Sequence, residues 1–359
     1  PPRSTLFPYT TLFRSGLSLN TQNQIEIKNR VIAKISRTEV ASKFMAPAPA
    51  TILQKLVTEG SITEEQARLA TNIPMADDIT VEADSGGHTD NRPLVLLLPA
   101  ILALRDQFQS KHGYAQPIRV GAAGGIGTPS SALAAFMMGA AYVATGSVNQ
   151  SCVEAAASLH SKNLLAQAEM TDVTMAPAAD MFEMGVELQV LKRGTMFPMR
   201  AKKLYELYKN YESIEEIPQQ ERLKLEQQVF RSSLDEIWRQ TVEHFNARDP
   251  HQIERAKDHP KRKMALIFRW YLGLSSRWSN SGEQGREADY QIWAGPAMGA
   301  FNNWVKGSYL EEVSNRKTVE VGWHIMTGAA YLYRLRLLQI QGVCFPPAGD
   351  VYTRQPFSV

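Results

Sequence analysis

The sequence has few cysteines, little net charge and no long apolar run, and each absence excludes a class of protein. Only Cys152 and Cys344 occur among 359 residues, so no disulfide framework is predicted and a reducing, cytoplasmic setting is expected. The 39 basic and 36 acidic residues leave a net charge of +3, which argues against a dedicated nucleic-acid binder. No apolar run reaches the roughly 18 residues of a membrane helix, and there is no recognisable signal peptide. No set of His, Cys and acidic residues has the spacing of a metal site.

Between residues 29 and 147, short β-branched runs alternate with helical stretches. Strands are predicted at 29–36, 78–82, 118–120 and 141–144. Helices are predicted at 38–44, 52–57, 63–69, 93–107 and 128–138, two of which begin with a capping residue, Thr63 or Thr128. This order is typical of successive βα repeats in a parallel barrel or an open sheet, so we predict an α/β fold.

Two glycine-containing loops follow neighbouring predicted strands. Gly121–Gly127 precedes a capped helix, and its glycines allow backbone N–H groups to approach a phosphate. It is neither a Walker loop nor a clean dinucleotide-binding fingerprint. A second small-residue loop, Thr145-Gly146-Ser147, follows the next strand. Two consecutive loops of this kind match the phosphate site of (β/α)₈ barrels, and tight turns without a ligand are the alternative.

One histidine lies on the polar loop that follows the strand at 78–82. His88 comes directly after two glycines and outside any apolar helical stripe. Histidine exchanges a proton near neutral pH, so we predict a functional role for His88, with Asp84 or Asp90 as candidate partners for its ring. A structural or solvated histidine is the alternative. The other six histidines occur in helical or basic contexts and are interpreted as structural or surface residues.

After about residue 195 the pattern of the sequence becomes mostly helical. The preceding polar-aromatic segments, 172–182 and 192–200, are interpreted either as part of a substrate mouth or as connectors between helices. Apolar residues at helical spacing between 225 and 245 predict a packed helical core. A basic run beside this region is either a solvated face or a surface for an acidic partner. It consists of Arg255, Lys257, Lys261, Arg262 and Lys263.

Both ends of the chain lack a clear structural pattern. Residues 1–7 are nearly echoed by residues 11–15, and the piece resembles a translated sequencing adapter; a disordered native terminus is the alternative. We exclude residues 1–15 from the predicted fold. The tail, 343–359, has adjacent prolines and mixed polarity and is predicted to be disordered.

Several of these segments resemble one family, the trans-acting enoyl reductases of polyunsaturated fatty acid and polyketide synthases. The resemblance lies in 82–93, which contains Gly-Gly-His, in 121–128 and in 145–150. It also lies in 192–200 and 268–278, motifs specific to this subgroup. These reductases belong to the nitronate monooxygenase (2-nitropropane dioxygenase)-like flavin barrels. The resemblance covers about residues 29–340.

The resemblance implies an FMN-binding TIM-type barrel with an extra helical region. Gly124, Gly125, Gly146 and Ser147 would hold the FMN phosphate, and His88 matches a histidine that lies near the flavin. The implied reaction reduces a trans-2-enoyl thioester on an acyl carrier protein, with NADPH as electron donor. Carrier proteins are acidic, so we interpret the basic run from 255 to 263 as a docking face.

The resemblance begins about three strands into the barrel, directly after residues 1–15. We therefore expect a partial TIM-type (β/α)₈ barrel with only the C-terminal strands, followed by a mostly α-helical region. Residues 16–195 are assigned to the barrel and 196–342 to the helical region. Because an open barrel exposes a strand edge and apolar surface, we expect residues 16–359 alone to fold poorly and not to bind FMN.

Two other functions remain open from the sequence. The same barrel would also suit a nitronate monooxygenase-type flavin oxidase, although the long helical C-terminal region argues against this function. A non-catalytic protein that scaffolds a synthase complex is the second alternative. The sequence does not specify the acyl chain length, the synthase that is served or the oligomeric state.

Overall fold

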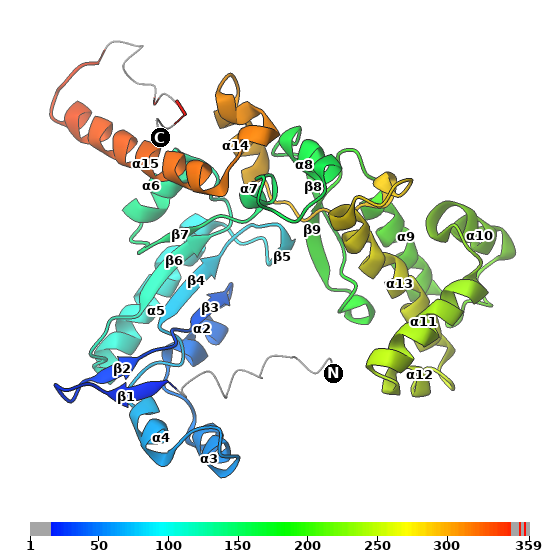
Figure 1. Ribbon diagram of the computed structural model, residues 1–359, viewed down its shortest axis with the longest axis horizontal. Coiled ribbons are helices and arrows are strands. Elements are labelled where there is room, and N and C mark those ends of the chain that lie inside the picture. Colours follow the sequence, from blue (N-terminus) through cyan, green and yellow to red (C-terminus); the bar gives the residue numbers. More distant parts are fainter. Residues whose placement is uncertain (1–15, 346–351, 353–354, 357–359) are drawn as a thin grey trace. The chain divides into compact units, whose positions relative to one another are not determined.

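The computed structural model describes residues 16–345, 352, 355 and 356 (Figure 1). The described residues fall into two compact units. The first comprises 16–84, Thr89–Gly146, and 325–345 with Tyr352, and the second comprises Ser85–His88 and Ser147–His324 with residues 355 and 356. The predictions for residues 1–15 and for most of the tail lie outside the described residues. The predicted boundary between 195 and 196 falls inside the second unit and stays a prediction.

The first unit contains a parallel sheet of four strands. These are β3 (Ile32–Ile35), β4 (Asp78–Glu82), β6 (Arg119–Ala123) and β7 (Val143–Ala144), in the order β3-β4-β6-β7. All four predicted strands are confirmed, and so is the α/β class. The central strands are buried except at their ends, as expected for a parallel sheet whose two faces are both covered. Ile32 on the edge strand β3 is 61% exposed. Closure of the sheet into a barrel stays a prediction.

The helices of the first unit, apart from α15, lie at the positions that the sequence predicts. They are α2 (Thr38–Met45), α3 (Ala50–Thr58), α4 (Glu64–Ala70), α5 (Leu94–His112), α6 (Pro129–Met137) and the last part of α15 (Thr318–Ile340). Both predicted N-caps form complete capping boxes, Thr63 with Gln66 and Thr128 with Ser131. A hairpin of β1 (Leu17–Leu19) and β2 (Ile25–Ile27), which the sequence did not predict, packs its apolar side chains against α3 and α4.

The second unit contains a small antiparallel sheet. Its strands are β5 (Gly87–His88), β9 (Glu187–Leu191) and β8 (Val173–Pro177), in that order. The segment 172–182, interpreted from the sequence as a mouth or a connector, therefore contains a strand. β8 and β9 are five residues long, and β5 pairs with β9 across about a hundred residues of chain. Local periodicity does not reveal pairing over such a separation.

Helices make up the rest of the second unit. They are α7 (Ser147–Gln150), α8 (Leu159–Ala166), α9 (Phe197–Asn210), α10 (Gln219–Lys224), α11 (Leu234–Arg248), α12 (His251–Glu254), α13 (Pro260–Ser281) and α14 (Ala297–Val305). The apolar stripe between 225 and 245 is packed as predicted, but it covers two helices. A π-helix, Leu225–Phe230, ends at Arg231, whose φ of 56° is left-handed, and Ser233 caps α11. No helix in the described ranges is long and apolar enough to span a membrane.

Candidate active site

His88 lies on the edge strand of the antiparallel sheet. Gly87 and His88 pair with Gln189 and Leu188 of β9, so the histidine is held on a short strand and not on a free loop as predicted. About one third of its side chain is exposed. The strand fixes the backbone of His88, and the partial exposure leaves its ring accessible to a ligand.

The imidazole ring has two neighbours in the second unit. Nε2 of His88 lies 3.1 Å from Oδ1 of Asp180, and the ring meets Trp293 edge-on with centroids 5.8 Å apart. A carboxylate that accepts the Nε2 proton leaves Nδ1 as the second position for proton exchange. The sequence-based choice of Asp84 or Asp90 as the partner is therefore wrong: Asp180, ninety-two residues away, takes that place.

Asp90 is engaged elsewhere, in the first unit. Its carboxylate accepts hydrogen bonds from both Nε and Nη2 of Arg37, each at 2.9 Å, and from Ser36 Oγ at 2.6 Å. The Arg37 and Ser36 hydrogen bonds lower the pKa of Asp90 to about 2. This bidentate pair fixes the loop after β4 to the end of β3, which is a structural role.

The two glycines before His88 allow a close backbone approach. A Cβ on Gly86 would lie 2.8 Å from the Ala294 backbone, and one on Gly87 would lie 2.7 Å from the Trp293 ring. Gly87 also has a φ of 81°, a left-handed conformation that favours glycine. Only glycine fits at either position, so the Gly-Gly-His motif is what brings the histidine against Trp293.

Ser147 contacts the same segment as His88. Its buried Oγ accepts a hydrogen bond from the Gly295 N–H at 2.9 Å, and Gln150 Nε2 donates to the Trp293 carbonyl at 2.6 Å. The segment from Trp293 to Gly295 therefore connects two of the residues predicted from the sequence. Sequence reasoning missed Trp293 because nothing local marks it as a neighbour of the Gly-Gly-His motif.

The other three predicted binding residues lie in the first unit, at the carboxyl ends of two adjacent strands. Ala123 of β6 and Ala144 of β7 are partners in register, so the loops that begin at Gly124 and Thr145 leave the sheet side by side. Gly124 has a φ of 78°, and a Cβ there would lie 2.6 Å from the Ala83 backbone. No atom lies within 4 Å of a Cβ placed on Gly125 or Gly146, so both loops leave open space.

The loop at the start of α6 also offers hydrogen-bond donors. The N–H groups of Gly127 and Thr128 donate to Ser131 Oγ, at 3.1 and 3.0 Å, as part of the capping box. The N–H groups of Gly124, Gly125 and Ile126 make no hydrogen bond within the part of the chain that the structure describes. Donor-rich backbone beside open space at a helix N-terminus fits a phosphate group.

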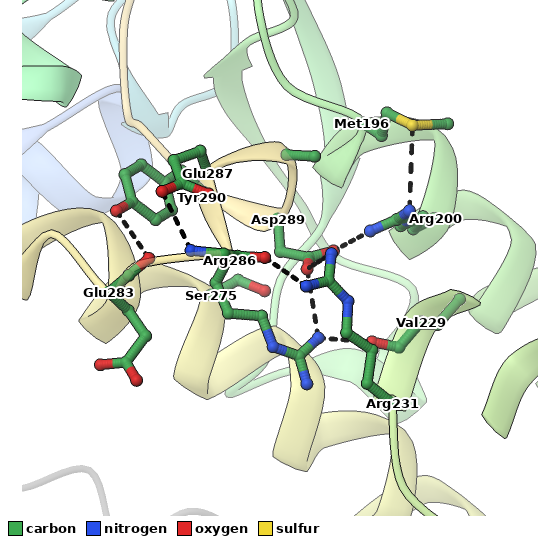
Figure 2. A network of polar contacts seen from close by, with 12 residues as sticks. Met196, Arg200, Val229, Arg231, Ser275, Glu283, Arg286, Glu287, Asp289 and Tyr290 are labelled. Atoms are coloured by element: carbon green, nitrogen blue, oxygen red, sulfur yellow. Dashed lines mark hydrogen bonds and ion pairs between the residues drawn. The ribbon is translucent and has the colours of Figure 1, made fainter. Parts of the chain in front are cut away.

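A buried carboxylate organises the helices of the second unit (Figure 2). Asp289 is fully buried and contacts the guanidinium groups of Arg200, Arg231 and Arg286. Tyr271 Oη also donates to it at 2.8 Å, and burial raises the pKa of Tyr271 far above its usual range. These residues join α9, α13, the end of the π-helix and the segment that follows α13. This cluster is not visible in the sequence, because its members come from four separate segments.

Two of the five cations in the basic run from 255 to 263 pair with nearby acids. Lys261 Nζ lies 3.1 Å from Glu212, and Lys263 Nζ lies 3.3 Å from Glu215. Arg262 donates to Gln252, and burial lowers its pKa. Arg255, Lys257 and Arg262 have no ion pair to the described residues. The interpretation of the run as a docking face stays a prediction.

Comparisons with known proteins identify the family. A family model described as [Acyl-carrier-protein] S-malonyltransferase, inserted helical domain, matches residues 211–290. One of the polyunsaturated fatty acid synthase subunits of Thraustochytrium sp. is 50% identical over 343 residues, which are 93% of this chain and 23% of that protein. Polyketide biosynthesis protein PksE of Bacillus subtilis is 51% identical over 322 residues, 90% of this chain and 42% of that protein. The chain thus spans less than half of either curated relative.

A solved structure extends this likeness to the fold. The enoyl reductase domain of MlnA, from the macrolactin biosynthesis cluster of Bacillus amyloliquefaciens, superposes with a TM-score of 0.88. The two chains are 40% identical, and the match covers 93% of this chain and 75% of that one. The chain belongs to the family of enoyl reductases of polyunsaturated fatty acid and polyketide synthases.

Proposed function

We propose that the protein reduces 2-enoyl thioesters carried by an acyl carrier protein, in trans, during polyunsaturated fatty acid or polyketide biosynthesis in the cytoplasm. The observation that carries this proposal is the 40% identity to the MlnA enoyl reductase domain over 93% of the chain. The match of 211–290 to a helical domain of an enzyme named for its carrier protein supports the same type of partner. FMN is the proposed cofactor and NADPH the proposed electron donor.

The residues of the two phosphate-type loops fit the FMN phosphate. Gly124 and Gly125 would direct their N–H groups at it, and Gly146 leaves room beside them. Ser147 follows Gly146 directly; its Oγ already accepts from Gly295, so it would contribute its own O–H as a donor. When bound, FMN would accept a hydride from NADPH and pass it to the β-carbon of the thioester.

His88 has the chemistry needed to complete this reduction. We infer that it donates a proton to the α-carbon of the enoyl thioester as the β-carbon receives the hydride. Asp180 occupies Nε2, so the transferred proton would come from Nδ1. Trp293 holds the ring edge-on and limits its rotation. Asp180 is a positioning residue in this scheme, and His88 is the catalytic residue.

Replacing Gly125 with aspartate tests the proposed cofactor site. In the full-length protein we expect Gly125→Asp to weaken FMN binding at least about tenfold, because a carboxylate beside the phosphate repels it. Gly113→Asp is a matched control: Gly113 also has a left-handed φ, 61°, and open space at its Cβ, but it lies at the end of α5. FMN affinity is measured by quenching of flavin fluorescence. Equal affinities for the two variants would place the phosphate elsewhere.

A further inference from the structure

A groove in the second unit is lined by lysines and methionines and contains none of the proposed catalytic or cofactor-binding residues. It has a volume of about 600 Å³ and lies between the first turns of α9, the start of β8 and the residue that follows β9. Its walls include Lys192, Lys202 and Lys203 together with Met196 and Met199. The segment 192–200, interpreted from the sequence as a substrate mouth or a connector, therefore borders this open groove.

The charge of this groove is only partly balanced. Lys203 pairs with Glu221 at 3.0 Å, whereas Lys192 and Lys202 have no ion pair within the described part of the chain. Lys202 Nζ reaches only Thr174 Oγ1, at 3.5 Å. Glu206 is the one acid in the lining. Two lysines thus keep their charge available for an anionic partner.

The groove also exposes apolar surface that can adapt its shape. Met196 is 42% exposed and Met199 60% exposed. Methionine side chains are flexible and polarizable, and they are common on surfaces that bind varied helices or acyl groups. Methionines rimmed by unpaired lysines complement a partner whose surface combines acidic and apolar residues.

We propose that this groove docks the acidic carrier protein that delivers the enoyl substrate, an inference that rests on the proposed function. The groove and His88 belong to the same sheet. His88 pairs with Leu188 on β9, and Lys192 follows Leu188 four residues later, which is about 14 Å along an extended strand. A carrier protein docked here delivers its acyl group to the sheet that carries His88.

Reversing the two unpaired charges tests this docking surface. In the full-length protein, Lys192→Glu with Lys202→Glu should weaken binding of a carrier protein bearing its prosthetic arm at least about tenfold, measured by calorimetry at low ionic strength. Lys192→Gln with Lys202→Gln should weaken it less. Arg255→Glu with Lys257→Glu is the matched control, since it reverses two charges that have no ion pair within the described residues, and it should leave binding near the wild-type value.

The outcomes separate the docking proposal from the proposed function. Docking predicts that the double glutamate variant loses at least about ten times more activity on the carrier-bound substrate than on the same enoyl group in a small thioester. Unchanged carrier binding in this variant, or an equal or larger loss in Arg255→Glu with Lys257→Glu, overturns the docking proposal. Failure of the wild-type protein to reduce either substrate overturns the proposed function, whatever the binding constants are.

Discussion

Replacing His88 with alanine is expected to lower the rate of enoyl reduction by the full-length protein about 100- to 10,000-fold. That range is typical for the loss of a positioned proton donor. The variant should still oxidise NADPH in the absence of the enoyl substrate, because His88 is proposed to act only on the thioester. Stopped-flow absorbance measures the two half-reactions separately, so the loss is assigned to the second of them.

A second histidine provides the control for this variant. His251 on α12 also contacts a carboxylate, Glu254, at 2.9 Å, but it is largely exposed. His251→Ala should leave both half-reactions at the wild-type rate. If His88→Ala reduces the enoyl thioester as fast as the wild type does, His88 is not the proton donor, and a different acid or a scaffolding role is favoured.

Replacing Asp289 with asparagine is expected to destabilise the protein by about 3–5 kcal/mol. Asp289 is fully buried among Arg200, Arg231 and Arg286, and its removal leaves these guanidinium groups without their common counterion. Arg286 also donates to the Val229 and Phe230 carbonyls. A shift of Arg286 would therefore also weaken the hydrogen bonds at the end of the π-helix. The free energy of unfolding is obtained from urea denaturation followed by tryptophan fluorescence.

An exposed acid that also pairs with an arginine tests whether burial of Asp289 causes the expected loss of stability. Glu236 on α11 forms two hydrogen bonds to Arg239, at 2.7 and 2.8 Å, and lies at the surface. Glu236→Gln should change stability far less than Asp289→Asn does, because water screens exposed ion pairs. Comparable losses in the two variants would mean that Asp289 does not organise the helices of the second unit.

The parts of the fold that depend on local chemistry were predicted correctly. The β-branched residues of β4 and the capping boxes at Thr63 and Thr128 act within a few residues of chain. The positions of Gly124 and Gly125, between a strand and a capped helix, follow from the same local signals. These features are visible in the sequence because the interactions that produce them are short-range.

The features that depend on distant residues were not predicted. Asp180 is the carboxylate beside His88, and the nearer acid Asp90 binds Arg37 instead. Trp293 meets the histidine from a segment two hundred residues later. The sequence shows two glycines before His88, but it does not show that the Ala294 backbone and the Trp293 ring come close to them. Only the tertiary pairing of β5 with β9 brings these groups together.

Enoyl reduction is tested most directly by identifying the product that the protein forms from a carrier-bound 2-enoyl thioester. The full-length protein is incubated with this substrate and NADPH, with and without FMN, and the acyl group is analysed by mass spectrometry. We expect a saturated acyl group, formed in step with NADPH oxidation and only when FMN is present. NADPH oxidation without a saturated product, or reduction that does not depend on FMN, would contradict the proposed function.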